Sequence, residues 1–221
     1  MITSHHNPAL QDVRRLLARR RQDGPARFVA EGEDLLAAAD AAGWAPEVRL
    51  RAGQDVTAQA LAKVSALMSG TRELAVYAER WADEPRDLCV ALWGVRDPGN
   101  VGTVLRGALA FGAGSVAIGP GTADPYGPKA VRASMGAIFS VPLVRVADVA
   151  ALPRPRLALV ARAGVALREA VAPGTIVVGA ERAGLPGEVV EGCDAVAHIP
   201  IASESLNAAM AATVALYEVR R

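Results

Sequence analysis

Three segments between residues 97 and 207 combine polar side chains with glycines at spacings that suit binding or catalysis. DPGNVGTVLR begins at Asp97, GAERAGLP begins at Gly179, and IPIASESLN begins at Ile199. Glycine lets a ligand approach the backbone closely, and Asn, Glu, Ser and Arg side chains can hold or position polar groups. Taken singly, each segment also fits a turn or a helix cap, because Asn, Ser and Gly are common in both.

The elements that must position these segments alternate along the chain. Apolar stretches at 88–93, 115–118, 141–146, 157–160, 175–178 and 196–199 predict strands, and stretches at 101–111, 129–135, 186–191 and 206–219 predict helices. Apolar strands that alternate with helices favour an α/β fold with a mostly parallel sheet covered on both faces. Each segment follows a strand, so we expect all three at the carboxyl edge of that sheet, where ligands bind in such folds.

Helix caps are also predicted within two of these segments. Asn100 is a candidate cap for the helix after the first segment, because an Asn side chain can accept a hydrogen bond from a free helix N–H. Ser203 or Ser205 is the candidate cap for the final helix, with Asn207 expected in its first turn.

The first part of the chain predicts a smaller α/β unit. Asn7 and Pro8 suit the start of a helix, and strands are predicted near 28–30, 48–50 and 74–77, with helices near 34–42 and 58–68. The polar stretch RWADEPRD at 80–87 is predicted to be a linker. We therefore expect one unit at residues 1–85 and a second at residues 86–221.

Basic residues gather near the N-terminus of a chain that is almost neutral. Its 24 basic and 23 acidic residues leave a formal net charge of +1, which excludes a uniformly basic protein but not a local basic patch. The first predicted helix and the residues after it carry six arginines: Arg14, Arg15, Arg19, Arg20, Arg21 and Arg27. This cluster is a candidate surface for nucleic-acid phosphates, and a solvated helix face is the alternative.

Several classes of protein are excluded or disfavoured by composition and by missing motifs. Hydrophobic residues make up 52% of the chain and charged residues 21%, which excludes a disordered chain. Cys89 and Cys193 are too few for a disulfide framework or a cysteine zinc site, and no metal site is expected. No phosphate-binding loop, dinucleotide glycine motif or serine-hydrolase elbow is present. Without an apolar signal core or a spanning segment, the chain is expected in the cytoplasm and not in a membrane.

In their order along the chain, the three segments resemble the motifs of the SpoU/TrmH family of RNA ribose 2′-O-methyltransferases. The matching residues are Asn100, Gly102 and Arg106; then Gly179, Glu181 and Gly184; then Ile199, Pro200, Ser205, Leu206 and Asn207. The stretch VRASMGAIFSVPLVRV at 131–146 also resembles the family. One departure is that IPIASESLN is shorter than in relatives, with Ala202 or Ser203 near the position of a glycine.

The first part of the chain is similar to the substrate-binding domain of the same family, which resembles ribosomal protein L30e. The similarity rests on NPALQDVRRLL, ARFVAEGEDLL and AADAAGW. It implies that residues 1–85 bind the RNA substrate.

The resemblance implies a trefoil-knotted sheet, S-adenosylmethionine as methyl donor and an RNA ribose 2′-hydroxyl as acceptor. It places Gly179, Ile199 and Leu206 around the cofactor. It assigns the catalytic site to Arg106, Asn100, Glu181, Ser205 and Asn207. A guanidinium is effectively always protonated, so we expect Arg106 to grip an RNA phosphate and orient the ribose rather than to act as a base.

The resemblance also implies partners. 23S ribosomal RNA is the expected substrate, with transfer RNA as the alternative, and a homodimer is expected through the second unit. The apolar side of the final helix, with Met210, Val214 and Leu216, could serve the dimer or the core of one protomer.

Two functions other than methyl transfer remain open at the level of the sequence. A non-catalytic RNA-binding protein could keep the same fold, and the shorter third segment favours that alternative. An unrelated nucleotide-binding α/β enzyme is disfavoured because the phosphate-binding motifs are missing. Binding of S-adenosylmethionine distinguishes the methyltransferase from both.

Overall fold

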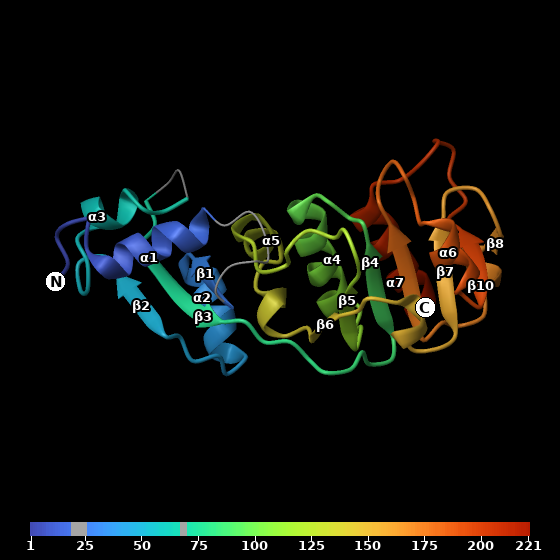
Figure 1. The fold of residues 1–221 in the computed structure, drawn as a ribbon, viewed down its shortest axis with the longest axis horizontal. Helices are drawn as coiled ribbons and strands as arrows, with labels where there is room; N and C mark the ends of the chain where they lie inside the picture. The colour runs from blue at the N-terminus through green and yellow to red at the C-terminus, as the bar shows by residue number, and fades with distance from the viewer. Residues whose placement is uncertain (19–25, 67–69) are drawn as a thin grey trace.

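The computed structural model describes residues 1–18, 26–66 and 70–221, which form two sheets arranged along an elongated molecule (Figure 1). The strands are β1 (Arg27–Glu31), β2 (Val48–Arg51), β3 (Glu73–Ala78), β4 (Cys89–Trp93), β5 (Ser115–Ile118), β6 (Leu143–Arg145), β7 (Arg156–Val160), β8 (Val165–Ala166), β9 (Thr175–Gly179) and β10 (Ala195–His198). The α-helices are α1 (Pro8–Leu17), α2 (Glu33–Ala41), α3 (Ala58–Ala62), α4 (Pro98–Ala110), α5 (Pro128–Ala133), α6 (Gly187–Glu191) and α7 (Ala208–Arg220).

The larger sheet has seven strands, and its pairings are all parallel. Its order is β6-β5-β4-β9-β7-β10-β8, so the strands that come earlier in the sequence lie on one side and the later strands on the other. This confirms the predicted α/β class with a parallel sheet. The smaller sheet is antiparallel in the order β1-β3-β2 and belongs to the first part of the chain.

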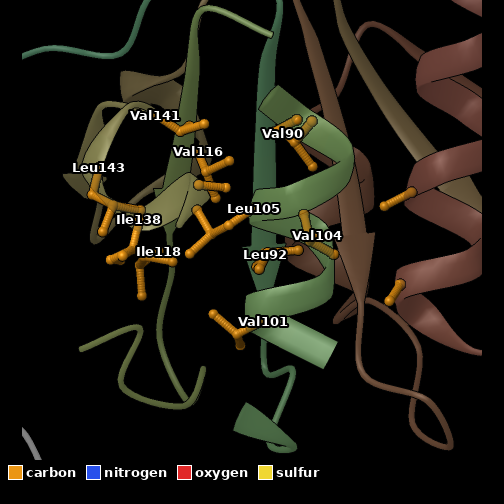
Figure 2. Packing of buried hydrophobic residues seen from close by; sticks show 14 of the residues in the cluster. Val90, Leu92, Val101, Val104, Leu105, Val116, Ile118, Ile138, Val141 and Leu143 are labelled. Atoms are coloured by element: carbon orange, nitrogen blue, oxygen red, sulfur yellow. The ribbon is translucent and has the colours of Figure 1, made fainter. Parts of the chain in front are cut away.

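Apolar side chains point alternately to the two faces of the larger sheet along its central strands, which explains why both faces are covered. In β4, Val90 and Leu92 point to one face, which α4 and α7 cover, while Cys89 and Ala91 point to the other face, beneath α6. Figure 2 shows α4 packing its Val101, Val104 and Leu105 over the first of these faces. All five residues of β4 and all five of β9 are buried, as expected of a parallel sheet covered on both sides.

The helix caps differ from the predictions in two of the three cases. The Asn7 side chain caps α1 as predicted, accepting a hydrogen bond from the Ala9 N–H at 3.0 Å. The N-cap of α4 is Asp97 and not Asn100, because the helix already begins at Pro98. The N-cap of α7 is Asn207 and not Ser203 or Ser205, because that helix begins only at Ala208.

One predicted helix is shorter in the structure, and one short strand was missed. The helix predicted over 58–68 ends at Ala62, and residues 67–69 lie outside the described part of the chain. The two-residue edge strand β8 was not predicted, because a stretch of that length carries no periodic signal.

Aromatic side chains join the two sheets into one hydrophobic core. The Phe28 ring lies 4.8 Å from the Tyr126 ring between centroids, and the Tyr77 ring lies 5.2 Å from that of Phe139. The indole N–H of Trp44 donates a hydrogen bond to the Phe139 carbonyl oxygen at 2.8 Å. Because edge and tilted aromatic pairs bury large apolar areas, this cluster holds the first part of the chain against the second.

The stretch at 80–87 contains no helix or strand but is held against the larger sheet. The backbone N–H of Arg80 donates to the Tyr126 hydroxyl at 3.1 Å, and the N–H of Ala82 donates to the Leu143 carbonyl at 2.7 Å. Further along, the N–H of Arg86 donates to Ser115 Oγ at 2.8 Å. These bonds restrain the connection, so it is not a free linker. Within the described residues, no helix is both long enough and apolar enough to span a membrane.

Candidate functional site

The three polar segments meet at the carboxyl edge of the larger sheet, where a chain of side-chain hydrogen bonds joins them. Asn207 Nδ2 donates to Asn100 Oδ1 at 3.0 Å, and Asn100 Nδ2 donates to Glu181 Oε1 at 2.5 Å. The segments follow β4, β9 and β10, and β4 and β9 are neighbours in the sheet. The tertiary structure therefore brings together three residues that lie up to 107 positions apart.

The donor-to-acceptor direction of these side-chain hydrogen bonds is set by helix α7, which begins directly after Asn207. Asn207 Oδ1 accepts from the backbone N–H groups of Ala209 and Met210, at 2.9 and 3.3 Å. Its Nδ2 must therefore face Asn100 as a donor, which leaves Nδ2 of Asn100 to donate to Glu181. Because the oxygen and the nitrogen of both amides are engaged in these hydrogen bonds, the two side chains are suited to hold the loops rather than to bind a ligand.

A pocket of about 450 Å³ lies beside Glu181, between the same loops. It is lined by Leu159, Val160, Ala161, Val178, Gly179, Ala180, Glu181, Arg182, Gly184, Leu185, Ile199, Ile201, Glu204, Ser205, Leu206, Ala208 and Ala211. All three residues predicted to surround the cofactor, Gly179, Ile199 and Leu206, are among them. Glu181 and Ser205 also line the pocket, whereas Asn100 and Asn207 reach it only through the hydrogen-bonded chain.

Gly179 is required by the close approach of the loop that follows it. A Cβ atom at this position would lie 2.4 Å from the carbonyl carbon of Gly184. Ala180 and Gly184 exchange two backbone hydrogen bonds, at 3.1 and 2.9 Å, and Gly184 has a φ of +68° that favours glycine. The loop between them is closed into a small hairpin, and this hairpin carries Glu181 at the pocket wall.

Gly102 serves helix packing in this structure. A Cβ atom there would lie 2.3 Å from the Ala130 carbonyl oxygen, so the glycine lets α4 approach α5 closely. Lys129 strengthens the same contact by donating to the Asp97 cap at 2.6 Å. This neighbouring charge lowers the pKa of the Asp97 carboxyl.

Arg106 lies apart from the other predicted catalytic residues. It is exposed on α4, does not line the pocket, and makes no hydrogen bond or ion pair with the described residues. On the adjacent helix α7, the apolar residues Met210, Val214 and Tyr217 are 57, 39 and 54% exposed. Their spacing of four and three residues places them along one side of α7.

The predicted basic cluster is only partly described. Arg14 and Arg15 are exposed on α1, whereas Arg19, Arg20 and Arg21 lie outside the described residues. Arg27 is half-buried, with its Nη1 at 2.9 Å from Asp12 and 3.6 Å from a Glu47 carboxylate oxygen. A phosphate at Arg27 would have to compete with these carboxylates.

Some pocket residues were missed by sequence reasoning. Leu159 and Val178 stand near the ends of strands β7 and β9, and Leu185 lies between the hairpin and α6. The positions at the ends of the predicted strands were the available signal, since ligand sites in α/β sheets form there. In the part of the chain that the structure describes, no group of His, Cys, Asp and Glu side chains has a metal-binding arrangement.

Comparisons with known proteins point to one family. The model of the SpoU rRNA Methylase family matches residues 87–217. The chain is 34% identical over 136 residues to the 23S rRNA (guanosine(2553)-2′-O)-methyltransferase RlmP of Bacillus subtilis, covering 57% of this chain and 55% of that protein. It is 36% identical over 144 residues to the 23S rRNA (uridine(2479)-2′-O)-methyltransferase of Streptomyces viridochromogenes, covering 56% and 49%. The chain thus spans about half the length of the curated relatives it matches.

Solved structures resemble nearly the whole chain. The AdoMet-bound rRNA methyltransferase from Sinorhizobium meliloti has a TM-score of 0.89 and 28% identity, covering 99% of this chain and 96% of that chain. The SpoU methyltransferase AviRb from Streptomyces viridochromogenes, in complex with AdoMet, has a TM-score of 0.85 and 26% identity, covering 97% of each chain. The likeness therefore includes the smaller sheet as well as the larger one.

Proposed function

Because the chain belongs to the SpoU rRNA Methylase family, we propose that it transfers the methyl group of S-adenosylmethionine to a ribose 2′-hydroxyl of RNA. The observation that carries this proposal is the pocket at the three motif loops, with Glu181 held at its wall by the chain from Asn207 through Asn100. 23S ribosomal RNA is the favoured substrate, because two curated relatives are named for methylating it. A ribosomal RNA substrate would place the protein in the cytoplasm.

The residues of the pocket fit S-adenosylmethionine. Leu159, Val178, Ile199 and Leu206 provide apolar walls of the kind an adenine ring needs, and the volume of about 450 Å³ lies within the range of small-molecule sites. The hairpin after Gly179 presents backbone groups at the same wall. When bound, the cofactor supplies a methyl group on a positively charged sulfur.

The protein must align the acceptor hydroxyl and handle its proton. Transfer requires the 2′-oxygen in line with the methyl group, and the hydroxyl loses its proton in the process. Ser205, whose side chain is exposed beside the pocket, is suited to position the ribose. Arg106 is suited to grip an RNA phosphate, since it is exposed and always charged.

A homodimer would explain why Arg106 lies outside the pocket of its own chain. The exposed residues Met210, Val214 and Tyr217 lie on α7, which packs against α4 where a Cβ atom at Gly107 would lie 3.0 Å from Thr213 Oγ1. A two-fold contact that buries this side of α7 would also bring in the outer side of α4, which carries Arg106. We propose that Arg106 of one protomer serves the pocket of its partner.

The same proposal extends to domain organisation and to the path of the chain. Residues 86–221 would form the catalytic domain, consistent with the family match over 87–217, and residues 1–85 would form an L30e-like domain that binds RNA with Arg14 and Arg15. We also propose that the C-terminal segment threads an earlier loop to make a trefoil knot. The packing of α7 against the much earlier helix α4 supports that path.

Mapping of 2′-O-methyl nucleotides by mass spectrometry tests the function. RNA from cells with and without the gene should differ at one 2′-O-methyl site in 23S ribosomal RNA. A difference confined to transfer RNA would favour the alternative substrate. No difference, together with no binding of S-adenosylmethionine in calorimetry, would favour a non-catalytic RNA-binding protein.

A further inference from the structure

Glu181 differs from the other charged residues that line the pocket. Three of the lining residues are ionisable: Glu181, Arg182 and Glu204. Arg182 and Glu204 are exposed, and the structure gives neither a side-chain hydrogen bond to the described residues. Glu181 is partly buried and accepts a hydrogen bond from Asn100 Nδ2. Its negative charge therefore has a defined place in the pocket wall.

The support behind Glu181 is continuous. The series of hydrogen bonds begins at the first N–H groups of α7, which carry the positive end of the helix dipole. It runs through the side chains of Asn207 and Asn100 to the carboxylate of Glu181. The hairpin closed by Ala180 and Gly184 holds the backbone on the other side. A charge fixed in this way needs little reorganisation when a ligand binds, so it acts on the charge of that ligand.

Resting on the proposed function, we propose that Glu181 makes the pocket select the cationic sulfonium of S-adenosylmethionine over the neutral thioether of S-adenosylhomocysteine. In the transfer, the bond between the methyl carbon and sulfur breaks, and its electron pair stays on sulfur. The methyl group bonds to the ribose oxygen, which releases its proton to solvent water. The cofactor sulfur therefore loses its positive charge at the moment of reaction, whereas the amino-acid part of the cofactor keeps the same charges. A fixed carboxylate attracts the substrate form and not the product form, which favours exchange of the spent cofactor for a fresh one.

Calorimetric titration of the full chain with each cofactor tests this selectivity. For Glu181→Gln, the Kd for S-adenosylmethionine should rise about tenfold, because a partly exposed ionic attraction is lost, whereas the Kd for S-adenosylhomocysteine should change little. Sinefungin, which carries a protonated amine in place of the sulfonium, should follow S-adenosylmethionine. Added salt should reduce the preference of the wild type but not that of the variant.

Two further variants separate charge from structure. Glu181→Asp keeps the charge and should retain a preference for the cationic ligands. Glu188→Gln removes a nearby exposed carboxylate that does not line the pocket, so it should leave the ratio of the two Kd values unchanged.

The outcomes distinguish this inference from the proposed function. Equal weakening of both cofactors by Glu181→Gln would overturn the inference and leave Glu181 a role in loop order alone. An equal loss of preference in Glu188→Gln would also overturn it, because the effect would then come from net charge. If the wild type binds neither cofactor, the proposed function fails, and the inference fails with it.

Discussion

Within the described range 70–221, Arg106 is the one catalytic candidate that neither bonds to the other motif residues nor lines the pocket. Asn100, Glu181 and Asn207 are bonded to one another, and Ser205 lines the pocket beside them. Arg106 is exposed on α4 and has no partner among the described residues. An arginine in this position contributes little to the stability of its own chain, which agrees with the proposal that it binds a phosphate of an RNA molecule.

Replacement of Arg106 by Ala should therefore remove methylation without unfolding the protein. We expect the rate of 2′-O-methylation to fall by a factor on the order of a hundred or more, because correct placement of the ribose is lost. The free energy of unfolding should change by less than about 0.5 kcal/mol, as for most exposed sites. Single-turnover assays and urea titrations measure the two quantities. Near-normal turnover would show that the assignment is wrong.

The hydroxyl of Tyr77 tests how much one unpaired polar atom in the core costs in stability. Its side chain is fully buried, and its hydroxyl has no hydrogen-bond partner among the described residues. Burial also raises the pKa of this hydroxyl, so it stays protonated at neutral pH. An unpaired buried hydroxyl costs about 1–3 kcal/mol, so Tyr77→Phe should increase the free energy of unfolding by about 1 kcal/mol. Urea denaturation measures this free energy. A lower free energy of unfolding in Tyr77→Phe would mean that the hydroxyl has a hydrogen-bond partner after all.

At the scale of elements, α7 links the stability of a helix to the geometry of the pocket. Asn207 uses its oxygen to cap the helix and its nitrogen to hold Asn100. One side chain thus serves two elements with opposite ends of its amide. Substitutions can separate these two contributions.

Asn207→Asp and Asn207→Ala should have different effects. Aspartate keeps the cap but loses the donor to Asn100, so we expect near-normal stability with weaker cofactor binding. Alanine loses both, so stability should also fall by about 1 kcal/mol. Thermal denaturation and calorimetric titration check the two effects separately. If aspartate binds the cofactor as well as the wild type does, the hydrogen-bonded chain does not position Glu181.

At the scale of the whole molecule, the two sheets depend on one another. Phe28, Trp44 and Tyr77 pack against Tyr126 and Phe139 across the two parts of the chain. Removing residues 1–85 would expose the partners of this cluster and disturb the packing of residues 86–221. Charge reversal at the exposed positions Arg14 and Arg15 is therefore the better test of RNA binding by the first part.

The proposed dimer depends on the exposed apolar side of α7. Replacing Met210 and Val214 together by Glu should convert a dimer into a monomer, because two charges would have to be buried at the contact. Light scattering at working concentration measures the mass, and circular dichroism checks that the helix remains. A wild-type protein that is monomeric at that concentration would contradict the proposal.

Local signals in the sequence were enough to identify most elements. The strands at β4, β5 and β9 carry continuous apolar residues, and Asn7 and Pro8 mark the start of α1. These features depend on neighbours a few residues away, because hydrophobic periodicity and capping are local. The sequence alone also led to the family, through the order of three short segments, and the three residues that it predicted around the cofactor, Gly179, Ile199 and Leu206, all line the pocket.

The tertiary structure decided which of those residues act together. Asn100 bonds to Glu181 across 81 positions and to Asn207 across 107, and no local pattern encodes such contacts. The caps at Asp97 and Asn207 depended on where each helix begins, which the packing of α4 and α7 determines. The outward position of Arg106 likewise follows from which side of α4 the sheet buries. Strand order and helix packing bring distant residues together, so these features become visible only in the folded chain.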